Sequence, residues 1–197
     1  LTMELDRSLF QLGVFANLVE EGSWVDAIID QRKANQAGPP QPDLRRMLRP
    51  VGPVGVFGAS NFPFAISVIG NDVVSAWAAG CPVVVKGHPG HPGTCELLGR
   101  CVQDVIRSKN LPEGIFSLVQ GTQNRVGEAL VQHPLIRAIG FTGSLRGGKS
   151  LWALTQKRTE PIPFFAELGS LNPTLAFPAI FRRNTSDFTK NLLASLT

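Results

Sequence analysis

The sequence predicts an α/β fold in which a parallel β-sheet is covered by helices on both faces. Two observations lead to this prediction. Short apolar runs without polar alternation recur between residues 51 and 166, and each of the first four is followed by a segment with a helical pattern. Strands that are apolar along their whole length are typical of sheets buried on both faces. Regular alternation of strands and helices is typical of parallel sheets.

The first fifty residues precede this sheet. Residues 1–21 are expected to form an amphipathic helix, because apolar side chains recur three and four positions apart, at Leu5, Leu9, Leu12, Ala16 and Val19. That apolar face should pack against another element. Residues 30–50 hold four prolines among polar residues and are expected to be an extended connector. The sheet domain itself is therefore expected to span residues 51–197.

Five strands are expected, over residues 51–58, 81–85, 115–119, 136–141 and 162–166. The helices that follow the first four strands are expected over residues 65–79, 94–108, 125–132 and 149–155. Gly80 ends the first of these helices as the residue after its C-terminus. The second helix should bury one face, formed by Leu97, Leu98, Cys101, Val102 and Val105. A further helix is expected over residues 186–197.

Composition limits the classes of function. The 197 residues are 43% hydrophobic, which is ample for a core, and the net charge of +4 comes from scattered basic residues without interleaved aromatic ones. We therefore expect no nucleic-acid partner. No apolar run reaches the length of a membrane span and no signal pattern opens the chain, so we expect no membrane association and a cytoplasmic piece of a longer protein. Its three cysteines lack metal-ligand spacing, which indicates reduced thiols and no metal site.

Polar side chains follow the ends of three expected strands, and ligands of parallel sheets bind at those ends. Asn61 can stabilise negative charge on an oxygen, or it is a turn residue before Pro63. Lys86 can bond a ribose or a phosphate, or its ammonium reaches out to water. Glu167 emerges from an apolar strand, where a raised pKa would suit a general base, unless the side chain turns to solvent.

A glycine-rich stretch, residues 139–148, is expected to be a strand, a tight turn and the start of a helix. Backbone N–H groups of such a turn can face a phosphate, and the helix dipole favours the negative charge. The alternative is an ordinary corner in which glycine supplies a positive φ. Each feature is weak alone, but the four together, each at the end of a different strand, strengthen the case for a ligand site.

The order of five motifs resembles the aldehyde dehydrogenase superfamily over almost the entire chain. The motifs are Asn61-Phe62-Pro63; Ala78-Ala79-Gly80 with Val83-Val84-Val85-Lys86; Leu111-Pro112-Glu113-Gly114; Phe141-Thr142-Gly143-Ser144 with Gly148; and Glu167-Leu168-Gly169 with Asn172-Pro173. The resemblance implies a Rossmann-like domain that binds NAD or NADP. It also implies oxidation of a small aldehyde to a carboxylic acid by a full-length protein that forms a homo-oligomer.

The same resemblance implies a role for each candidate residue. Asn61 would be the oxyanion-hole amide, and Glu167 the general base that activates the deacylating water. Lys86 would bind the adenosine ribose, and Leu168 would border the nicotinamide. The residues against the pyrophosphate would be Gly143, Ser144 and Gly148.

Departures from the family pattern point to one branch. Gly87-His88-Pro89 follows Lys86 where the family has P-S-E, so the acid that would repel a 2′-phosphate is missing. NADP is then permitted, with His88 near Lys86 in the cofactor site. Together with the short stretch before Asn61 and with Ser170-Leu171, this pattern resembles the branch that acts on 2-oxoglutarate semialdehyde (2,5-dioxovalerate).

The family's nucleophile lies in a G-Q-x-C segment that none of the three cysteines, Cys81, Cys95 and Cys101, matches. The segment would follow the last expected helix. We therefore expect this chain to bind a nucleotide but to be inactive toward aldehydes by itself. The alternative is a truncated nucleotide-binding module with no chemistry of its own.

Overall fold

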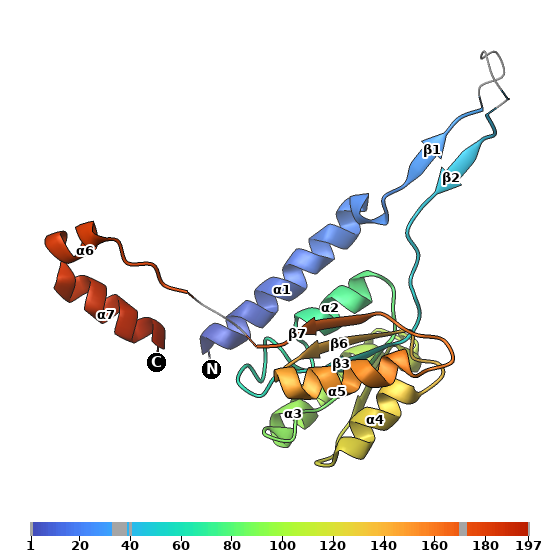
Figure 1. Ribbon diagram of the computed structural model, residues 1–197. Helices are drawn as coiled ribbons and strands as arrows, with labels where there is room; N and C mark the ends of the chain where they lie inside the picture. The colour runs from blue at the N-terminus through green and yellow to red at the C-terminus, as the bar shows by residue number, and fades with distance from the viewer. Residues whose placement is uncertain (1, 33–38, 40, 170–172, 197) are drawn as a thin grey trace.

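A five-stranded parallel sheet forms the centre of the molecule, and it confirms the predicted α/β class (Figure 1). The structure is a computed structural model that describes residues 2–32, 39, 41–169 and 173–196. The strand order is β5-β4-β3-β6-β7, and every pair of neighbours is parallel. The strands are β3 (Val54–Phe57), β4 (Val83–Lys86), β5 (Phe116–Val119), β6 (Ala138–Thr142) and β7 (Phe164–Glu167).

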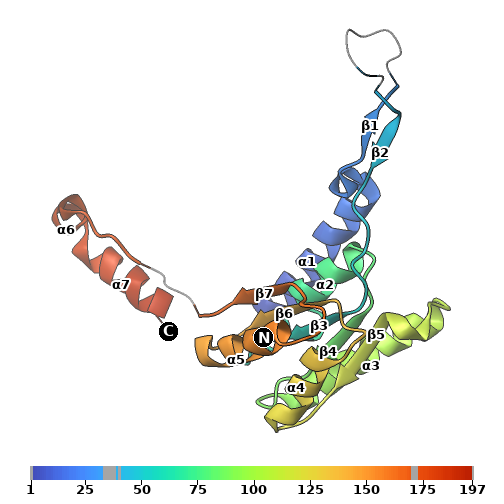
Figure 2. The same cartoon turned by 45° about the vertical axis from the view of Figure 1, so that its right-hand side comes forward.

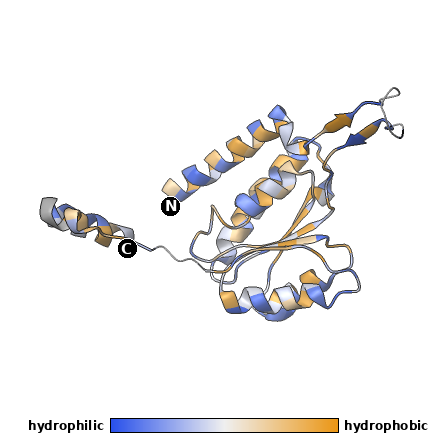
Figure 3. Ribbon diagram, turned by 45° about the horizontal axis from the view of Figure 1, so that its top comes forward, coloured by the Kyte–Doolittle hydropathy of each residue, from blue (hydrophilic) through white to orange (hydrophobic). Residues whose placement is uncertain are grey.

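Helices cover both faces of this sheet (Figure 3). On one face α2 (Asn71–Ala78) and α3 (Pro92–Ser108) enclose a core that includes Val56, Val85 and Phe116. On the other face α4 (Asn124–Gln132) and α5 (Leu145–Gln156) pack over Phe57 and Ile139. Successive residues of β3 thus enter different cores, which explains why the strand is apolar throughout.

The segment predicted as one helix over residues 65–79 is helical only in α2. Elsewhere, a 3-10 turn, η2 (Glu113–Ile115), precedes β5. Residues 63–69, by contrast, form successive turns. The turns fold back on the end of β3, where a Cβ on Gly58 would lie 2.5 Å from the Ile66 carbonyl oxygen. The Asn71 N–H donates to the Ala65 carbonyl at 3.2 Å, so the backbone closes a loop there instead of continuing a helix.

Helix α5 begins at Leu145, four residues before the predicted start. The Ser144 hydroxyl accepts the N–H of Gly147 at 3.2 Å and caps the helix. Gly147 and Gly148 therefore lie in the first helical turn, and the glycine-rich corner is shorter than predicted. The predicted apolar face of α3 is also partly wrong, because Leu97, Cys101 and Val105 are exposed while other side chains of the helix, Cys95, Leu98 and Ile106, are buried.

The N-terminal region holds a helix, α1 (Thr2–Glu21), a 3-10 turn, η1 (Ser23–Val25), and a two-stranded antiparallel ribbon. The ribbon pairs β1 (Ile28–Asp30) with β2 (Leu44–Arg46) and extends away from the sheet (Figure 2). The predicted connector, residues 30–50, is therefore extended at β2 as expected, and the pairing of β2 with β1 was not predicted. Residues 33–38 and 40 of that connector lie outside the described residues.

The helix α1 is confirmed, but its predicted packing face is partly wrong. Leu5, Leu9 and Val19 are 40%, 57% and 45% exposed, whereas Leu12 of that face is half-buried. The side turned to the protein holds Ser8, which is fully buried, and four half-buried residues, Glu4, Gln11, Leu12 and Phe15. The helix lies beside α2 (Figure 1).

Two last helices, α6 (Pro178–Arg183) and α7 (Thr185–Leu196), contact each other and stand apart from the sheet in both Figure 1 and Figure 2. The motif residues Ser170, Leu171 and Asn172 lie outside the described residues. In the part of the chain that the structure describes, no helix is long and apolar enough to span a membrane.

Candidate functional site

A cavity of about 1120 Å³ opens where the loops after the five strands of the sheet meet. Parallel strands end at the same edge of a sheet, so residues distant in the sequence meet there. The predicted site residues that line the cavity are Asn61 after β3, Lys86 and His88 at the end of β4, Gly143 and Ser144 after β6, and Glu167 at the end of β7. The inner sides of α4 and α5 complete its wall.

Two predicted residues, Gly148 and Leu168, are not among the residues lining the cavity; they contact each other. A Cβ on Gly148 would lie 2.0 Å from Leu168 Cδ2. The missing side chain at position 148 thus lets α5 approach the chain that leaves β7. Glycine at this position has a packing reason that is independent of any ligand.

Backbone N–H groups at the start of α5 are partly occupied. Gly143 donates to the Glu167 carbonyl at 3.1 Å, and Gly148 donates to the Ser144 carbonyl at 2.9 Å. Among the described residues, the first-turn N–H groups of Leu145 and Arg146 have no protein acceptor. These two groups, and not those of the predicted glycines, are the ones that can face an anion at the helix N-terminus.

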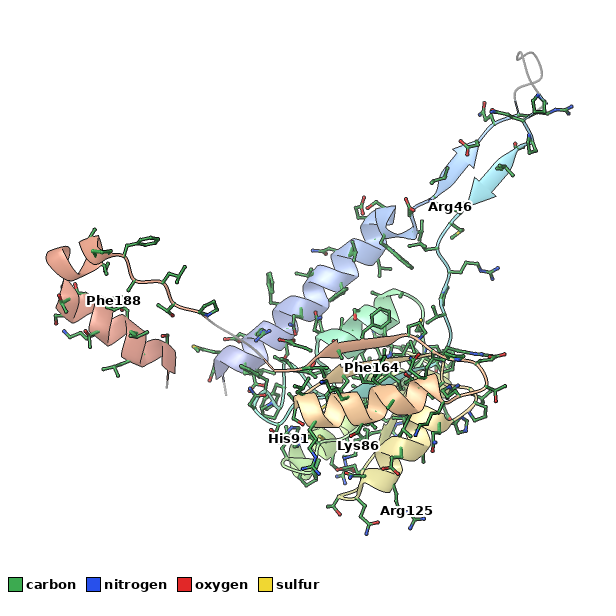
Figure 4. All side chains as sticks on the ribbon, in the orientation of Figure 1. Arg46, Lys86, His91, Arg125, Phe164 and Phe188 are labelled. Carbon is green, nitrogen blue, oxygen red and sulfur yellow. The ribbon has the colours of Figure 1, made fainter. Side chains whose placement is uncertain are left out.

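The basic side of the cavity is formed by Lys86, labelled in Figure 4, and by His88. Partial burial lowers the pKa of the Lys86 ammonium, and the nearby Cys95 opposes this effect. Burial also lowers the pKa of His88, and the neighbouring His91 and Lys86 add to the shift. The Nδ1 atom of His88 accepts the Gly90 N–H at 3.0 Å, so the neutral ring carries its proton on Nε2 and offers a donor.

A second histidine, His91, joins the loop after β4 to the loop after β3 (Figure 4). Its Nε2 lies 3.1 Å from the Ala59 carbonyl oxygen, which can only accept, so Nε2 carries the proton. Its Nδ1 then accepts from the buried Cys95 thiol at 3.3 Å. The ring also stacks on His88, with centroids 5.5 Å apart.

The loop that bears Asn61 is held from the N-terminal helix. Glu4 Oε1 accepts the N–H groups of Phe64 at 2.7 Å and of Ala65 at 3.1 Å. The Arg7 guanidinium carbon lies 5.5 Å from the centroid of the Phe62 ring, within the range of a cation–π contact. Asn61 itself is exposed into the cavity.

Glu167 ends the outer strand β7 and is exposed, so the predicted apolar surroundings of its carboxylate are wrong. The cause is the outer position of β7, which also leaves Phe165 67% exposed. Its charge acts on Asp72 in the first turn of α2: burial raises the pKa of Asp72, and Glu167 adds to the rise. The Asp72 carboxylate packs over Gly140 of β6, where a Cβ would lie 3.3 Å from its Oδ2.

The family model described as "Aldehyde dehydrogenase family" matches residues 14–186. The chain belongs to the aldehyde dehydrogenase family. The resemblance predicted from its five motifs is thereby confirmed.

Individual members of the aldehyde dehydrogenase family match as follows. Alpha-ketoglutaric semialdehyde dehydrogenase 2 of Azospirillum brasilense is 44% identical over 98% of the chain, and alpha-ketoglutaric semialdehyde dehydrogenase of Acinetobacter baylyi is 45% identical over 98%. The chain spans 37% and 36% of the length of these two relatives. The crystal structure of a NAD-dependent benzaldehyde dehydrogenase from Corynebacterium glutamicum superposes with a TM-score of 0.63 and 25% identity. That match covers 82% of this chain and 33% of the other.

The cysteines of this aldehyde dehydrogenase family chain do not line the cavity, although Cys95 lies close to Lys86 behind the loop after β4. Cys81 and Cys95 are buried and Cys101 is exposed on α3, and none of the three lines the cavity. Within the described residues, no group of three or more His, Cys, Asp or Glu side chains could hold a metal ion.

Sequence reasoning missed Glu4 and Asp72, and it gave His91 no role in the site. For this family member, the motif Gly87-His88-Pro89-Gly90-His91 contained a usable signal, since two histidines three residues apart in a tight loop can stack. Glu4 gave no local signal, because its partners lie sixty residues further along the chain.

Proposed function

We propose that the full-length protein oxidises an aldehyde to a carboxylic acid with NAD or NADP, and that the aldehyde is 2-oxoglutarate semialdehyde. The observation that carries the proposal is the single cavity that brings Asn61, Lys86 and Glu167 together at one edge of the sheet. Membership of the aldehyde dehydrogenase family supports the reaction. The names of the two relatives support the substrate, because alpha-ketoglutaric and 2-oxoglutaric semialdehyde are the same compound.

The cavity fits a dinucleotide. Lys86 supplies a cation with two or three donors for ribose hydroxyls, His88 supplies a neutral donor beside it, and Gly143 and Ser144 stand where α5 begins. A helix N-terminus favours the negative charge of a pyrophosphate. Gly148 and Leu168 act indirectly, since their contact sets how closely α5 approaches the chain that leaves β7; in this proposal Leu168 would border the nicotinamide. When bound, the cofactor accepts a hydride from the substrate.

Two side chains of this chain take part in the proposed reaction at the substrate. The Asn61 amide donates a hydrogen bond to the carbonyl oxygen as it gains negative charge, an effect that contributes about 3 kcal/mol in other enzymes. The Glu167 carboxylate removes a proton from the water that releases the acid. Its exposed position lets the proton pass on to solvent.

The nucleophilic thiolate comes, in this proposal, from a part of the protein beyond these residues, because no cysteine of this chain lines the cavity. The chain by itself then binds the cofactor and does not turn over aldehyde. The same observation favours a second candidate function, a nucleotide-binding module without chemistry. The proposed full-length enzyme is a cytoplasmic homo-oligomer.

A cofactor titration with matched variants tests the binding step. NADH and NADPH should each bind the chain, and Lys86→Ala should weaken both about tenfold or more, as expected for loss of a charged hydrogen-bond donor. Lys109→Ala, on the exposed end of α3, serves as the control. Equal affinities for all three proteins would overturn the assigned role of Lys86. Turnover of 2-oxoglutarate semialdehyde by the chain alone would overturn the claim about the nucleophile.

A further inference from the structure

We propose that Glu4, assisted by Arg7, is the positioning residue for Asn61, so that the N-terminal helix α1 sets the direction of the amide that polarises the substrate. This inference rests on the proposed function for the role of Asn61. The clamp itself is a structural claim that can be tested separately. It assigns α1 a part in the site, although the predicted boundary at residue 50 places this helix outside the sheet domain.

The loop after β3 cannot satisfy its own backbone donors. Pro63 has no N–H, and the Ile66 N–H donates to the Phe62 carbonyl at 3.1 Å, as in a single helical turn. The N–H groups of Phe64 and Ala65 are then first-turn donors without a partner in the turn. One oxygen of Glu4 accepts both. A carboxylate at the N-terminus of a turn is a strong acceptor, because its hydrogen bonds are charge-assisted.

The docking of α1 is consistent with this role. Glu4, Ser8 and Gln11 are spaced four and three apart, so they share one face of the helix. The inward side also holds the half-buried Leu12 and Phe15, whereas other apolar side chains of the helix, such as Leu9 and Phe10, are 57% and 71% exposed. Burial of apolar area therefore accounts for only part of this orientation. The hydrogen bonds from the Phe64 and Ala65 N–H groups to Glu4 join α1 to the loop after β3 and add to it, whereas the buried Ser8 hydroxyl donates within α1, to the Glu4 carbonyl at 3.1 Å.

Contacts fix the loop on both sides of Asn61. On the N-terminal side, Ala59 donates to the Ile66 carbonyl at 2.9 Å, which closes the loop onto β3. On the C-terminal side, Arg7 lies over the ring of Phe62, the residue next to Asn61. The attachments at Ala59, to Ile66 and to His91, come from the sheet domain, whereas the side-chain contacts at Phe62, Phe64 and Ala65 come from α1. An oxyanion donor must be preorganised to be effective, so a loose loop lowers the rate without weakening cofactor binding.

Amide hydrogen exchange of the chain tests the clamp directly. Glu4→Ala should speed exchange of the Phe64 and Ala65 amides about tenfold or more, while Glu4→Gln, which keeps an acceptor oxygen, should restore most of the protection. Glu20→Ala is the matched control, since Glu20 is exposed on the same helix. If Glu4→Ala exchanges at these amides like the Glu20 control, the clamp is refuted, whatever the protein catalyses.

The catalytic consequence is tested in the longer protein that includes a nucleophile. Glu4→Ala should lower kcat about tenfold and leave the KM for the cofactor unchanged, and it should have no further effect on top of Asn61→Ala. Equal effects of Glu4→Ala in the presence and absence of Asn61 would refute the link between the two residues. Absence of any aldehyde turnover would refute the proposed function, while the exchange result would still stand for the clamp.

Discussion

A single arginine side chain, Arg158, closes the C-terminal end of α4. Besides the nearby Glu160 carbonyl, which its Nε reaches at 3.3 Å, its guanidinium donates to the carbonyls of Val131 and Ile136 at 2.7 and 3.0 Å, which are partly buried, and to those of His133 and Pro134, which are exposed. The last four carbonyls lie in the last turn of α4 and in the segment that leads into β6. The side chain thus holds a helix end to the start of a central strand.

Arg158→Ala is expected to lower the free energy of unfolding by about 3 kcal/mol. Water can replace the guanidinium at the two exposed carbonyls. The loss in the free energy of unfolding therefore comes mainly from the carbonyls of Val131 and Ile136. Each buried acceptor left without a donor costs about 1–3 kcal/mol. For a chain of this size, the melting temperature should then fall by about 6–12 °C.

Urea and thermal unfolding of three variants measure this effect. Arg158→Lys keeps the charge but not the planar fork, and its stability should lie between those of the parent and Arg158→Ala. Arg100→Ala is the control, because Arg100 forms an exposed ion pair with Glu96 at 2.9 Å, a type of pair worth less than about 1 kcal/mol. If Arg158→Ala loses no more stability than Arg100→Ala, the four carbonyl contacts do not stabilise the fold.

Three further predictions concern the surroundings of the cavity. Gly58→Ala should destabilise the protein by about 1–3 kcal/mol and loosen residues 60–70 in hydrogen exchange, since its Cβ would meet backbone atoms that cannot rotate away. Gly114→Ala, where nothing lies within 4 Å, should leave both measurements unchanged. Gly148→Ala should weaken NADH binding, and adding Leu168→Ala should restore it, because the clash is with the far end of that side chain; additive losses would contradict this. Asp72→Asn should raise the free energy of unfolding at pH 7. The raised folded pKa of Asp72 means that its stabilising contribution is present below its ordinary value of 3.8 and is lost as pH rises through the folded pKa. The gain from Asp72→Asn should therefore shrink as pH falls through the raised pKa, and a gain that persists below pH 3.8 would refute the buried-charge explanation.

The sheet and its strand-end residues could be predicted from the sequence because their signals are local. An apolar run such as Val83-Val84-Val85 must be buried on both faces, and the residue after it must then stand at the ligand edge. The start of α5 was placed too late because glycine has a low helix propensity, whereas the Ser144 cap outweighs it in the structure.

The face of α1 and the surroundings of Glu167 could not be predicted, since both depend on neighbours distant in the sequence. The apolar pattern at Leu5 and Leu9 indicated a buried face, but the docking of the helix also depends on the acceptor that Glu4 supplies to another loop. Glu167 follows apolar residues in the sequence, but its strand, β7, is an edge strand of the sheet. The periodicity of apolar residues does not show which strand lies at an edge.

The imidazole of His91 gives the two halves of the site a fixed spacing. The ring nitrogen Nε2 bonds the Ala59 carbonyl, and the other nitrogen, Nδ1, bonds the Cys95 thiol at the start of α3. The loop after β4 therefore keeps a constant distance between the start of α3 and the loop after β3. A residue inserted into this loop would change the separation between the ribose end and the Asn61 end, even though neither end itself had changed. The length of the loop after β4 and the position of the loop after β3 are therefore coupled through His91. A change in the length of the first loop requires a matching change in the second.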